Sequence, residues 1–140
     1  MKNFLNFYSL VIKIEKFEWK MATKKIAFPG TVQGLYGELS MHFGHAPAFT
    51  TIQYDENTKD VVAVEVLKNV PHERGGCLTP VMLLKNYGVS EIVIGGIGQR
   101  PLLGFIEVGI EPYKGFLGTI KENFEAFRKD KLEKLSQSTC

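Results

Sequence analysis

The short run Ile92-Val93-Ile94, followed at once by Gly95, constrains the fold of this chain more than any other stretch. No polar residue interrupts it, and it has the length of a β-strand, so we expect a strand that is buried on both faces. Such a strand needs packing partners above and below the sheet. The chain has 140 residues, which is enough for one domain with a real hydrophobic core.

The segments before this run predict a strand and a hairpin. Residues 25–29 are typical of a short strand that ends at a Pro-Gly pair. Residues 30–44 contain four glycines and predict a loop. Residues 49–55 and 61–67 are rich in β-branched and aromatic side chains, and the polar turn residues between them predict a hairpin.

The segments around and after the run predict helices that alternate with strands. Residues 80–88 and the stretch from the glycine turn at 95–98 to Gly109 favour two helices, and residues 110–113 a brief strand. Thr119 and Glu122 fit a capping box that opens a last helix. Its core-facing stripe is expected from three apolar residues at helical spacing, Ile120, Phe124 and Phe127. The order strand, hairpin, then alternating helix and strand predicts an α/β domain with a mixed sheet and helices packed on it.

The expected organisation is one domain over residues 21–130. Residues 1–20 are interpreted as an extension or a mis-assigned start and receive no function, and residues 131–140 as a polar tail that frays after Arg128. The chain has 17 basic and 15 acidic residues, a balance that argues against a nucleic-acid partner. Two cysteines give no disulfide framework, and no apolar run is long enough to span a bilayer, so we expect a cytoplasmic protein without a membrane partner.

The side chains best suited to bind a metal lie between Met41 and Cys77. This stretch holds all three histidines and one of the two cysteines. Imidazole and thiolate are the ligands that borderline and soft metals prefer, so the sequence predicts a metal site formed by His42, His45, His72 and Cys77. The alternative for each histidine is a loop side chain hydrogen-bonded to a carbonyl.

Two glycine-rich turns precede predicted helices and could cradle an anion with their backbone N–H groups. The predicted cradle residues are Gly75, Gly76, Gly95, Gly96, Gly98 and Arg100. The second turn lacks the spacing of a dinucleotide fingerprint, because Pro101 stands at the position of its third glycine. The glycines could instead simply allow tight strand-to-helix turns.

Several ordered motifs resemble the dinitrogenase iron-molybdenum cofactor-binding (NifX-like) family. They are His42-Phe-Gly-His45-Ala-Pro47, Asn69 to His72, Gly75-Gly76-Cys77, the run from Ile92 to Gly98 with Arg100-Pro101, Gly109-Ile110, and Gly118-Thr119-Ile120. The resemblance covers about residues 24–130. It implies a ribonuclease H-like fold without nuclease activity, and a role in binding or carrying iron–sulfur or iron–molybdenum clusters during their assembly. The implied partners are such a cluster and the proteins that assemble or accept it.

Two other functions are compatible with the same residues. The glycine turns and Arg100 would also suit a binding or regulatory module for a phosphorylated small molecule. A small hydrolase built on Cys77 and His72 is the least favoured interpretation, because no third group that would orient the pair is evident.

Overall fold

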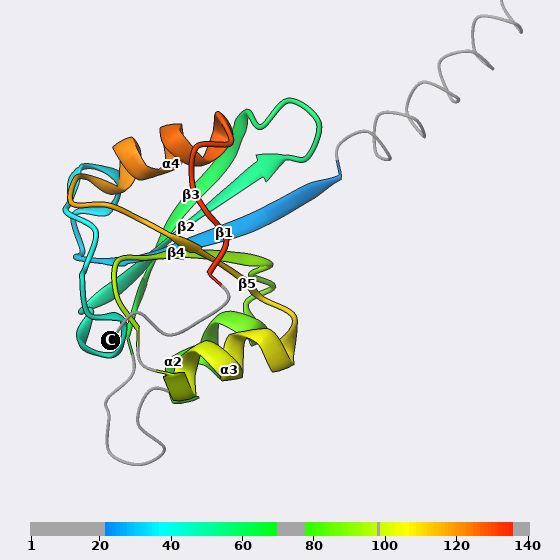
Figure 1. Cartoon of the computed structure of the whole chain (residues 1–140). Coiled ribbons are helices and arrows are strands. Elements are labelled where there is room, and N and C mark those ends of the chain that lie inside the picture. The colour runs from blue at the N-terminus through cyan, green and yellow to red at the C-terminus, as the bar shows by residue number, and fades with distance from the viewer. Residues whose placement is uncertain (1–21, 70–77, 98, 136–140) are drawn as a thin grey trace, which may run out of the picture.

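Five strands form one mixed sheet in the part of the chain that the computed structural model describes, residues 22–69, 78–97 and 99–135 (Figure 1). The strands are β1 (Thr23–Gly30), β2 (Ala48–Asp55), β3 (Val61–Lys68), β4 (Glu91–Ile94) and β5 (Glu111–Lys114), and their spatial order is β3-β2-β1-β4-β5. The first three strands are antiparallel neighbours, whereas β4 runs parallel to β1 and β5 runs parallel to β4. This is the predicted α/β architecture, with the hairpin at one side of the sheet and the parallel strands at the other.

Helices cover both faces of this sheet. The helices are α2 (Leu78–Asn86), α3 (Gln99–Val108) and α4 (Ile120–Arg128), and two 3-10 turns, η1 (Gly34–Tyr36) and η2 (Phe43–His45), lie between β1 and β2. Figure 1 shows α2 and α3 together on one face and α4 on the other. No described helix has the length and apolar character needed to cross a bilayer.

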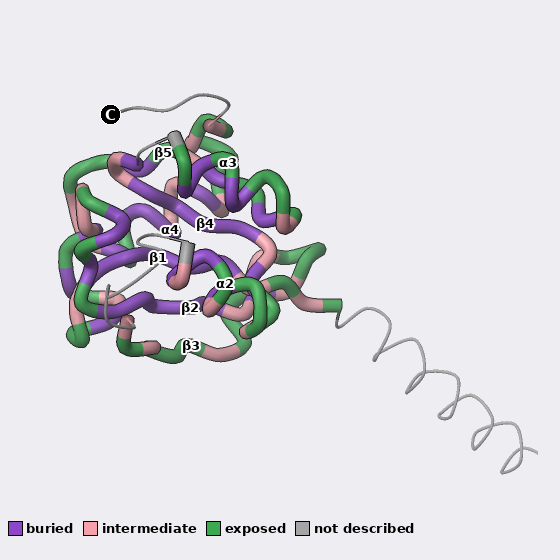
Figure 2. The backbone as a smooth tube through the Cα atoms, turned by 90° about the horizontal axis from the view of Figure 1, so that it is seen from below, coloured by how far each residue is buried: buried purple, intermediate pink, exposed green. Residues whose placement is uncertain are grey.

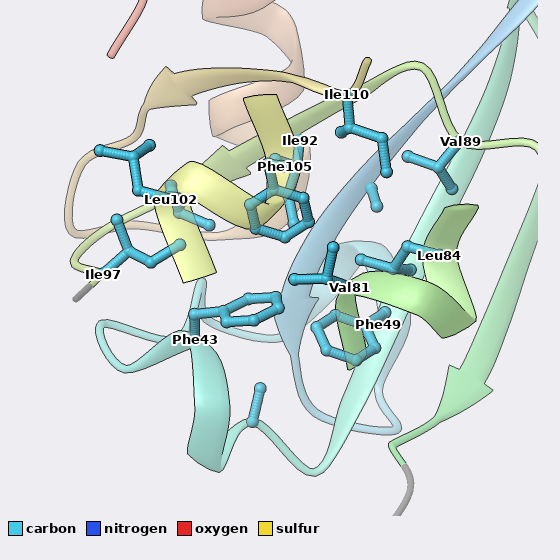
Figure 3. Close-up of a cluster of buried hydrophobic side chains, with 13 residues drawn as sticks. Phe43, Phe49, Val81, Leu84, Val89, Ile92, Ile97, Leu102, Phe105 and Ile110 are labelled. Carbon is cyan, nitrogen blue, oxygen red and sulfur yellow. The ribbon is translucent and has the colours of Figure 1, made fainter. Parts of the chain in front are cut away.

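The central strands divide the core into two layers. Along β4, Ile92 and Ile94 belong to the cluster under α2 and α3, whereas Val93 between them belongs to the cluster under α4. All three are fully buried, so the strand is covered on both sides as its sequence predicts. The first cluster also contains side chains from α2 and α3, among them Leu84 and Phe105 (Figure 3).

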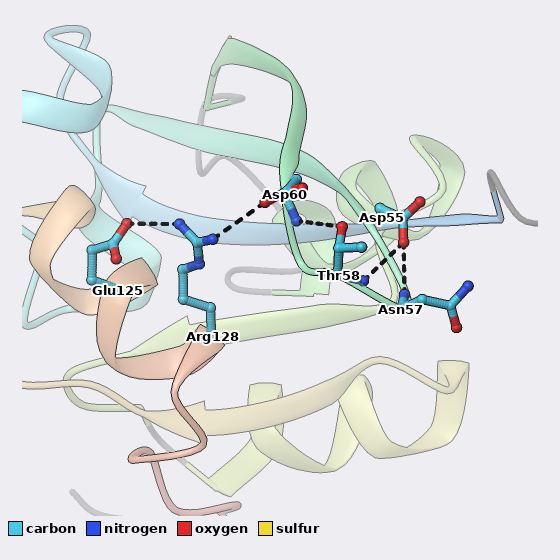
Figure 4. A network of polar contacts seen from close by, with 6 residues as sticks. All are labelled: Asp55, Asn57, Thr58, Asp60, Glu125 and Arg128. Carbon is cyan, nitrogen blue, oxygen red and sulfur yellow. Dashed lines mark hydrogen bonds and ion pairs between the residues drawn. The ribbon is translucent and has the colours of Figure 1, made fainter.

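The predicted local signals are confirmed where they are strongest. The Thr119 hydroxyl accepts a hydrogen bond from the Glu122 N–H (3.0 Å), and the Glu122 carboxylate accepts one from the Thr119 N–H (2.8 Å), which completes the capping box. In the turn between β2 and β3, the Asp55 carboxylate accepts hydrogen bonds from the N–H groups of Asn57 and Thr58 (Figure 4). These two bonds lower the pKa of Asp55.

The prediction of a fraying tail after Arg128 is wrong for the described residues. The chain turns back at Asp130, which has a positive φ of 57°, and then runs beside β5. The Lys114 N–H donates to the Glu133 carbonyl (2.8 Å), and the Leu135 N–H donates to the Pro112 carbonyl (2.8 Å). Local composition predicted a solvated tail because the stretch is rich in charge, but its backbone covers the outer edge of β5. Residues 1–20 and 136–140 lie outside the described residues.

One buried ionisable pair sits within the sheet, away from the loops that carry the histidines. The Tyr54 hydroxyl of β2 donates a hydrogen bond to the carboxylate of Glu91, at the start of β4. Glu91 is only 7% exposed. Burial raises the pKa of the Glu91 carboxyl above its ordinary value, and the hydrogen bond from Tyr54 offsets part of that rise.

We expect Thr119→Ala to lower the free energy of unfolding by about 1 kcal/mol at neutral pH, because an N–H of the first helical turn loses its acceptor. The pKa of Glu122 is held below its ordinary value first by the bond from the Thr119 backbone N–H, which alanine keeps, and then by the bond from the Thr119 hydroxyl, which alanine loses. The contribution of the hydroxyl bond exists above the pKa of the unfolded chain and is lost as the pH falls. The difference in free energy of unfolding between the variant and the wild type should therefore become smaller at acidic pH. Urea denaturation at several pH values measures it, with Lys121→Ala in the same turn as the control.

We expect Glu91→Gln to become progressively more stable than the wild type as the pH rises. The native Glu91 carboxyl holds its proton more tightly than the unfolded chain does, so its favourable contribution is complete below the unfolded pKa of about 4.3 and is lost as the pH rises through the raised native value. The glutamine side chain of the variant stays neutral at every pH, so the variant does not lose this stability as the pH rises. Denaturation curves from about pH 4 to pH 8 test it, and an unchanged difference across that range would contradict it. The exposed Glu107→Gln is the control.

Candidate metal-cluster site

Three connections of the described chain begin at the same end of the sheet, where β1, β3 and β4 finish and β2 starts. The register places the last residue of β1, Gly30, opposite the first residue of β2, Ala48, and Ala48 opposite the last residue of β3, Lys68. Since β4 is parallel to β1, the C-terminal end of β4 lies at this end of the sheet too. The loop with His42 and His45, the segment after β3 and the glycine turn after β4 therefore begin close together, on the left-hand side of Figure 1.

The histidine loop is anchored by the residues between and after its two imidazoles. Phe43 is 2% exposed, and its ring packs against those of Phe49 (centroids 5.5 Å apart) and Phe105 (5.0 Å, edge to face) (Figure 3). His42 and His45 are both exposed. One turn of 3-10 helix thus fixes the backbone through Phe43 and leaves the two histidine side chains at the surface.

Hydrogen bonds fix the same backbone from its N-terminal side. The Ser40 hydroxyl accepts a bond from the His42 N–H (3.2 Å) and donates one to the His42 carbonyl (3.0 Å). The Ser40 N–H donates to the carbonyl of Pro29 at the end of β1 (2.8 Å). The His45 N–H closes the turn by donating to the His42 carbonyl (3.2 Å). The position of His42 is therefore tied to the sheet rather than left to a free loop.

The glycine turn after β4 lies directly against the histidine loop. The Phe43 N–H donates to the Gly96 carbonyl at 3.4 Å. A Cβ atom at Gly95 would lie 2.4 Å from the Met41 sulfur, and one at Gly96 would lie 2.8 Å from the Met41 carbonyl oxygen. At Gly96 the obstacle is a backbone atom, so only glycine allows this approach, whereas at Gly95 the obstacle is chiefly the Met41 side chain. The contact accounts for both glycines without an anionic ligand, and an anion cradle at these positions stays a prediction.

The segment that carries the other two predicted ligands starts from the same place. Asn69 follows β3, and its side-chain amide donates to the Ala46 carbonyl (2.8 Å) while its backbone N–H donates to the Pro47 carbonyl (3.0 Å). His72 and Cys77 come within eight residues of Asn69 along the chain. Both lie outside the described residues, as do three of the predicted cradle glycines, Gly75, Gly76 and Gly98.

Among the described residues alone, no group of three or more His, Cys, Asp or Glu is gathered as a metal ion would require. His42 and His45 share one turn, and any further ligand must come from elsewhere. Arg100 is exposed at the second position of α3. The four-ligand set thus remains a prediction, of which the structure describes two members.

Sequence reasoning did not assign the residues that hold the site together. Ser40, Met41 and Asn69 each position the histidine loop through contacts with other segments of the chain, Ser40 through its N–H to the Pro29 carbonyl. In the sequence, Asn69 is only part of a motif and Met41 is only the boundary of the histidine-rich stretch, so neither residue type indicates a positioning role. The adjacent glycines after a buried strand are the one signal of a close backbone contact, and in the sequence they fit a turn or an anion cradle equally well.

Comparisons with known proteins find similar sequences and similar structures. An uncharacterized protein of Methanocaldococcus jannaschii is 29% identical to this chain over 117 residues, which is 82% of this chain and 94% of that protein. The NMR structure of a Thermotoga protein, provisionally described as a NifB protein, is 26% identical, with a TM-score of 0.68 over 84% of this chain and 97% of its own.

The apo form of the orange protein from Desulfovibrio gigas has a TM-score of 0.72, covering 84% of this chain and 97% of its own. Its identity of 19% shows a shared fold alone. The sequence model of the dinitrogenase iron-molybdenum cofactor family matches residues 24–130, which include the whole sheet from Lys24 onward and every helix described above. The chain therefore belongs to the dinitrogenase iron-molybdenum cofactor family.

Proposed function

We propose that this protein binds an iron–sulfur or iron–molybdenum cluster as cargo and carries it during cofactor assembly or delivery. Family membership supports an association with this class of cofactor. The observation that carries the proposal is the contact of the histidine loop with the Gly95-Gly96 turn, beside the point where Asn69 leads toward His72 and Cys77. We also propose that the strand order β3-β2-β1-β4-β5 is the ribonuclease H-like arrangement.

The donor set suits a cluster of this kind. Neutral imidazole nitrogens and a thiolate are ligands for iron and for other metals of intermediate softness. His42 and His45 are exposed on a backbone that is held from both sides, so a cluster could reach them without any opening of the core. Clusters with several sulfides are anionic. Lys68 lies opposite Ala48, at the end of the sheet where the histidine loop also lies, so its positive charge favours such a cluster.

A carrier must also release what it holds. Two exposed imidazoles and at most a few further ligands give an open site, from which an acceptor protein can take the cargo by ligand exchange. Such a role requires no catalytic group, and the partners would be the proteins that supply or receive the cluster. A phosphorylated small molecule is less well supported, because packing against Met41 already accounts for Gly95 and Gly96.

We expect the double variant His42→Ala/His45→Ala to bind iron at least about ten-fold more weakly than the wild type, since changes to outer-shell groups alone cost about 10–100-fold. The measurement is anaerobic reconstitution with ferrous iron and sulfide, followed by the absorption spectrum and the iron content per chain. Glu107→Ala, an exposed substitution on α3, is the control. Retention of the full iron content by the double variant would exclude this site. Parallel His72→Ala and Cys77→Ser variants divide the remaining binding between those two ligands.

We expect Gly96→Ala to weaken iron loading although every proposed ligand is retained. The added methyl group would meet the Met41 carbonyl oxygen, a backbone atom that can move only together with the histidine loop. Gly95→Ala should have a smaller effect, because the methyl group there meets chiefly the Met41 side chain, which can rotate away. The same loading assay compares the two, with circular dichroism to confirm folding. Equal loading of Gly96→Ala and the wild type would show that the contact does not position the ligands.

A further inference from the structure

Asn123 of α4 is a polar side chain that is fully buried, at 0% exposure. Its amide oxygen accepts a hydrogen bond from the Phe116 N–H (3.0 Å), and its amide nitrogen donates to the carbonyls of Phe116 (3.1 Å) and Thr119 (3.0 Å). Burial of an amide is unfavourable unless its hydrogen bonds are made. These three bonds tie the loop between β5 and α4 to the helix.

The start of α4 does not depend on this amide. The capping box of Thr119 and Glu122 already supplies the hydrogen bonds of the first helical turn. Two of the three bonds of Asn123 reach Phe116, which lies outside the helix, and they hold both its N–H and its C=O group. An apolar side chain of similar size would fill the same space without fixing these backbone groups. The amide is therefore accounted for by the shape of the loop.

The same loop is paired with the segment that leads into the histidine loop. The Leu39 N–H donates to the Gly118 carbonyl (2.9 Å), and the Ile120 N–H donates to the Gly37 carbonyl (2.9 Å). The two segments run antiparallel at this point. The loop after β5 therefore fixes the backbone of residues 37–39.

Leu39 is the point where this segment enters the core. Its side chain is 3% exposed and belongs to the cluster under α4. A Cβ atom at Gly115 would lie 2.5 Å from the Leu39 side chain and 2.8 Å from the Asn123 amide oxygen, so both side chains pack against the same glycine. The next residue, Ser40, is hydrogen-bonded to the backbone of His42. The contacts thus run without a gap from Asn123 to His42.

The histidine loop is consequently held by both core layers. Phe43 packs in the layer under α2 and α3, and Leu39, before the histidines, packs in the layer under α4. Both layers lie on β1, β2 and β4, which are buried along most of their length (Figure 2). The backbone of His42 lies between these two anchors, so its position depends on both.

We propose that Asn123 is a positioning residue that holds His42 in place, acting through the loop after β5 and through Leu39. The inference rests on the proposed function, because a fixed imidazole matters where a cargo has to be bound. Asn123 is buried beneath the loop and acts only through other residues. Without its amide the loop loses its fixed shape, and His42 samples several positions while the sheet and the helices remain.

Asn123→Ala in the full chain tests the proposal. We expect this variant to bind iron about three-fold or more weakly in loading with ferrous iron and sulfide, the size of effect of a residue that acts through others. Phe127→Leu, on the buried face of the same helix, is the matched control. It also lowers stability but does not touch the loop after β5, so it should load iron like the wild type. Wild-type loading of Asn123→Ala, or an equal loss in both variants, would overturn the proposal.

Amide hydrogen exchange of the protein without iron separates positioning from general stability. Asn123→Ala should make the Leu39 amide exchange about ten-fold faster or more, because its bond to Gly118 opens locally. The Ser90 amide, bonded to the Lys25 carbonyl at the opposite end of the sheet, should exchange as in the wild type. A purely structural role would speed both amides alike and would contradict the proposal.

A second variant covers the case in which Asn123→Ala does not fold. Asn123→Asp has the same shape and keeps an acceptor for the Phe116 N–H, but when ionised it cannot donate to the carbonyls of Phe116 and Thr119. It should show the same faster exchange at Leu39, and an unchanged rate there would refute the proposal. Exchange needs no cargo. If the wild type loads no iron, the proposed function fails, whereas the exchange rates still decide whether Asn123 holds the loop.

Discussion

The burial of two central strands on both faces is the constraint on which the structure depends. β1 and β4 send alternate side chains into the two core layers, so neither layer can form without the other. Each large apolar side chain buried there contributes roughly 1.5–3 kcal/mol relative to exposure to water. Helices α2 and α3 on one side and α4 on the other are required because the strand sequence leaves no polar face for solvent.

The candidate site is an extension of one of these layers. Phe43 belongs to the same cluster as Phe105 of α3 and Ile92 of β4, and it is flanked by residues whose imidazoles face solvent. Core packing therefore determines where His42 can lie, and the Gly96 contact determines how near the loop comes to the end of β4. The backbone of the site is thus held by buried contacts, while the histidine side chains that could bind a ligand are exposed. A preorganised binding site requires such a fixed backbone.

Local patterns in the sequence were sufficient for the elements and insufficient for their long-range contacts. The β4 run, the hairpin turn at Asp55 and the capping box at Thr119 depend on a few adjacent residues, and each is present as predicted. The pairing of residues 133–135 with β5 depends on a partner some twenty residues earlier, which local composition does not reveal.

The same limit applies to the site. The histidine pair and the glycine pair are both recognisable as motifs, but their contact through Met41 joins segments more than fifty residues apart. The outer position of β3 among the described strands was equally hidden, because a valine-rich strand looks the same in sequence whether a neighbour covers it or not. The periodicity of a sequence indicates which residues form a strand. The position of that strand within the sheet, at an edge or in the middle, is known only from the structure.

The backbone that runs beside β5 has a consequence for how the protein is made. During synthesis every strand of the sheet leaves the ribosome before Glu133 and Leu135 do, so the outer edge of β5 stays uncovered until these two residues have emerged. Any fusion or label joined at the C-terminus must leave the backbone up to residue 135 free to reach Lys114 and Pro112. A chain that stops at Arg128 would keep the described helices α2, α3 and α4 but would expose the outer edge of β5, where another strand could pair and start aggregation.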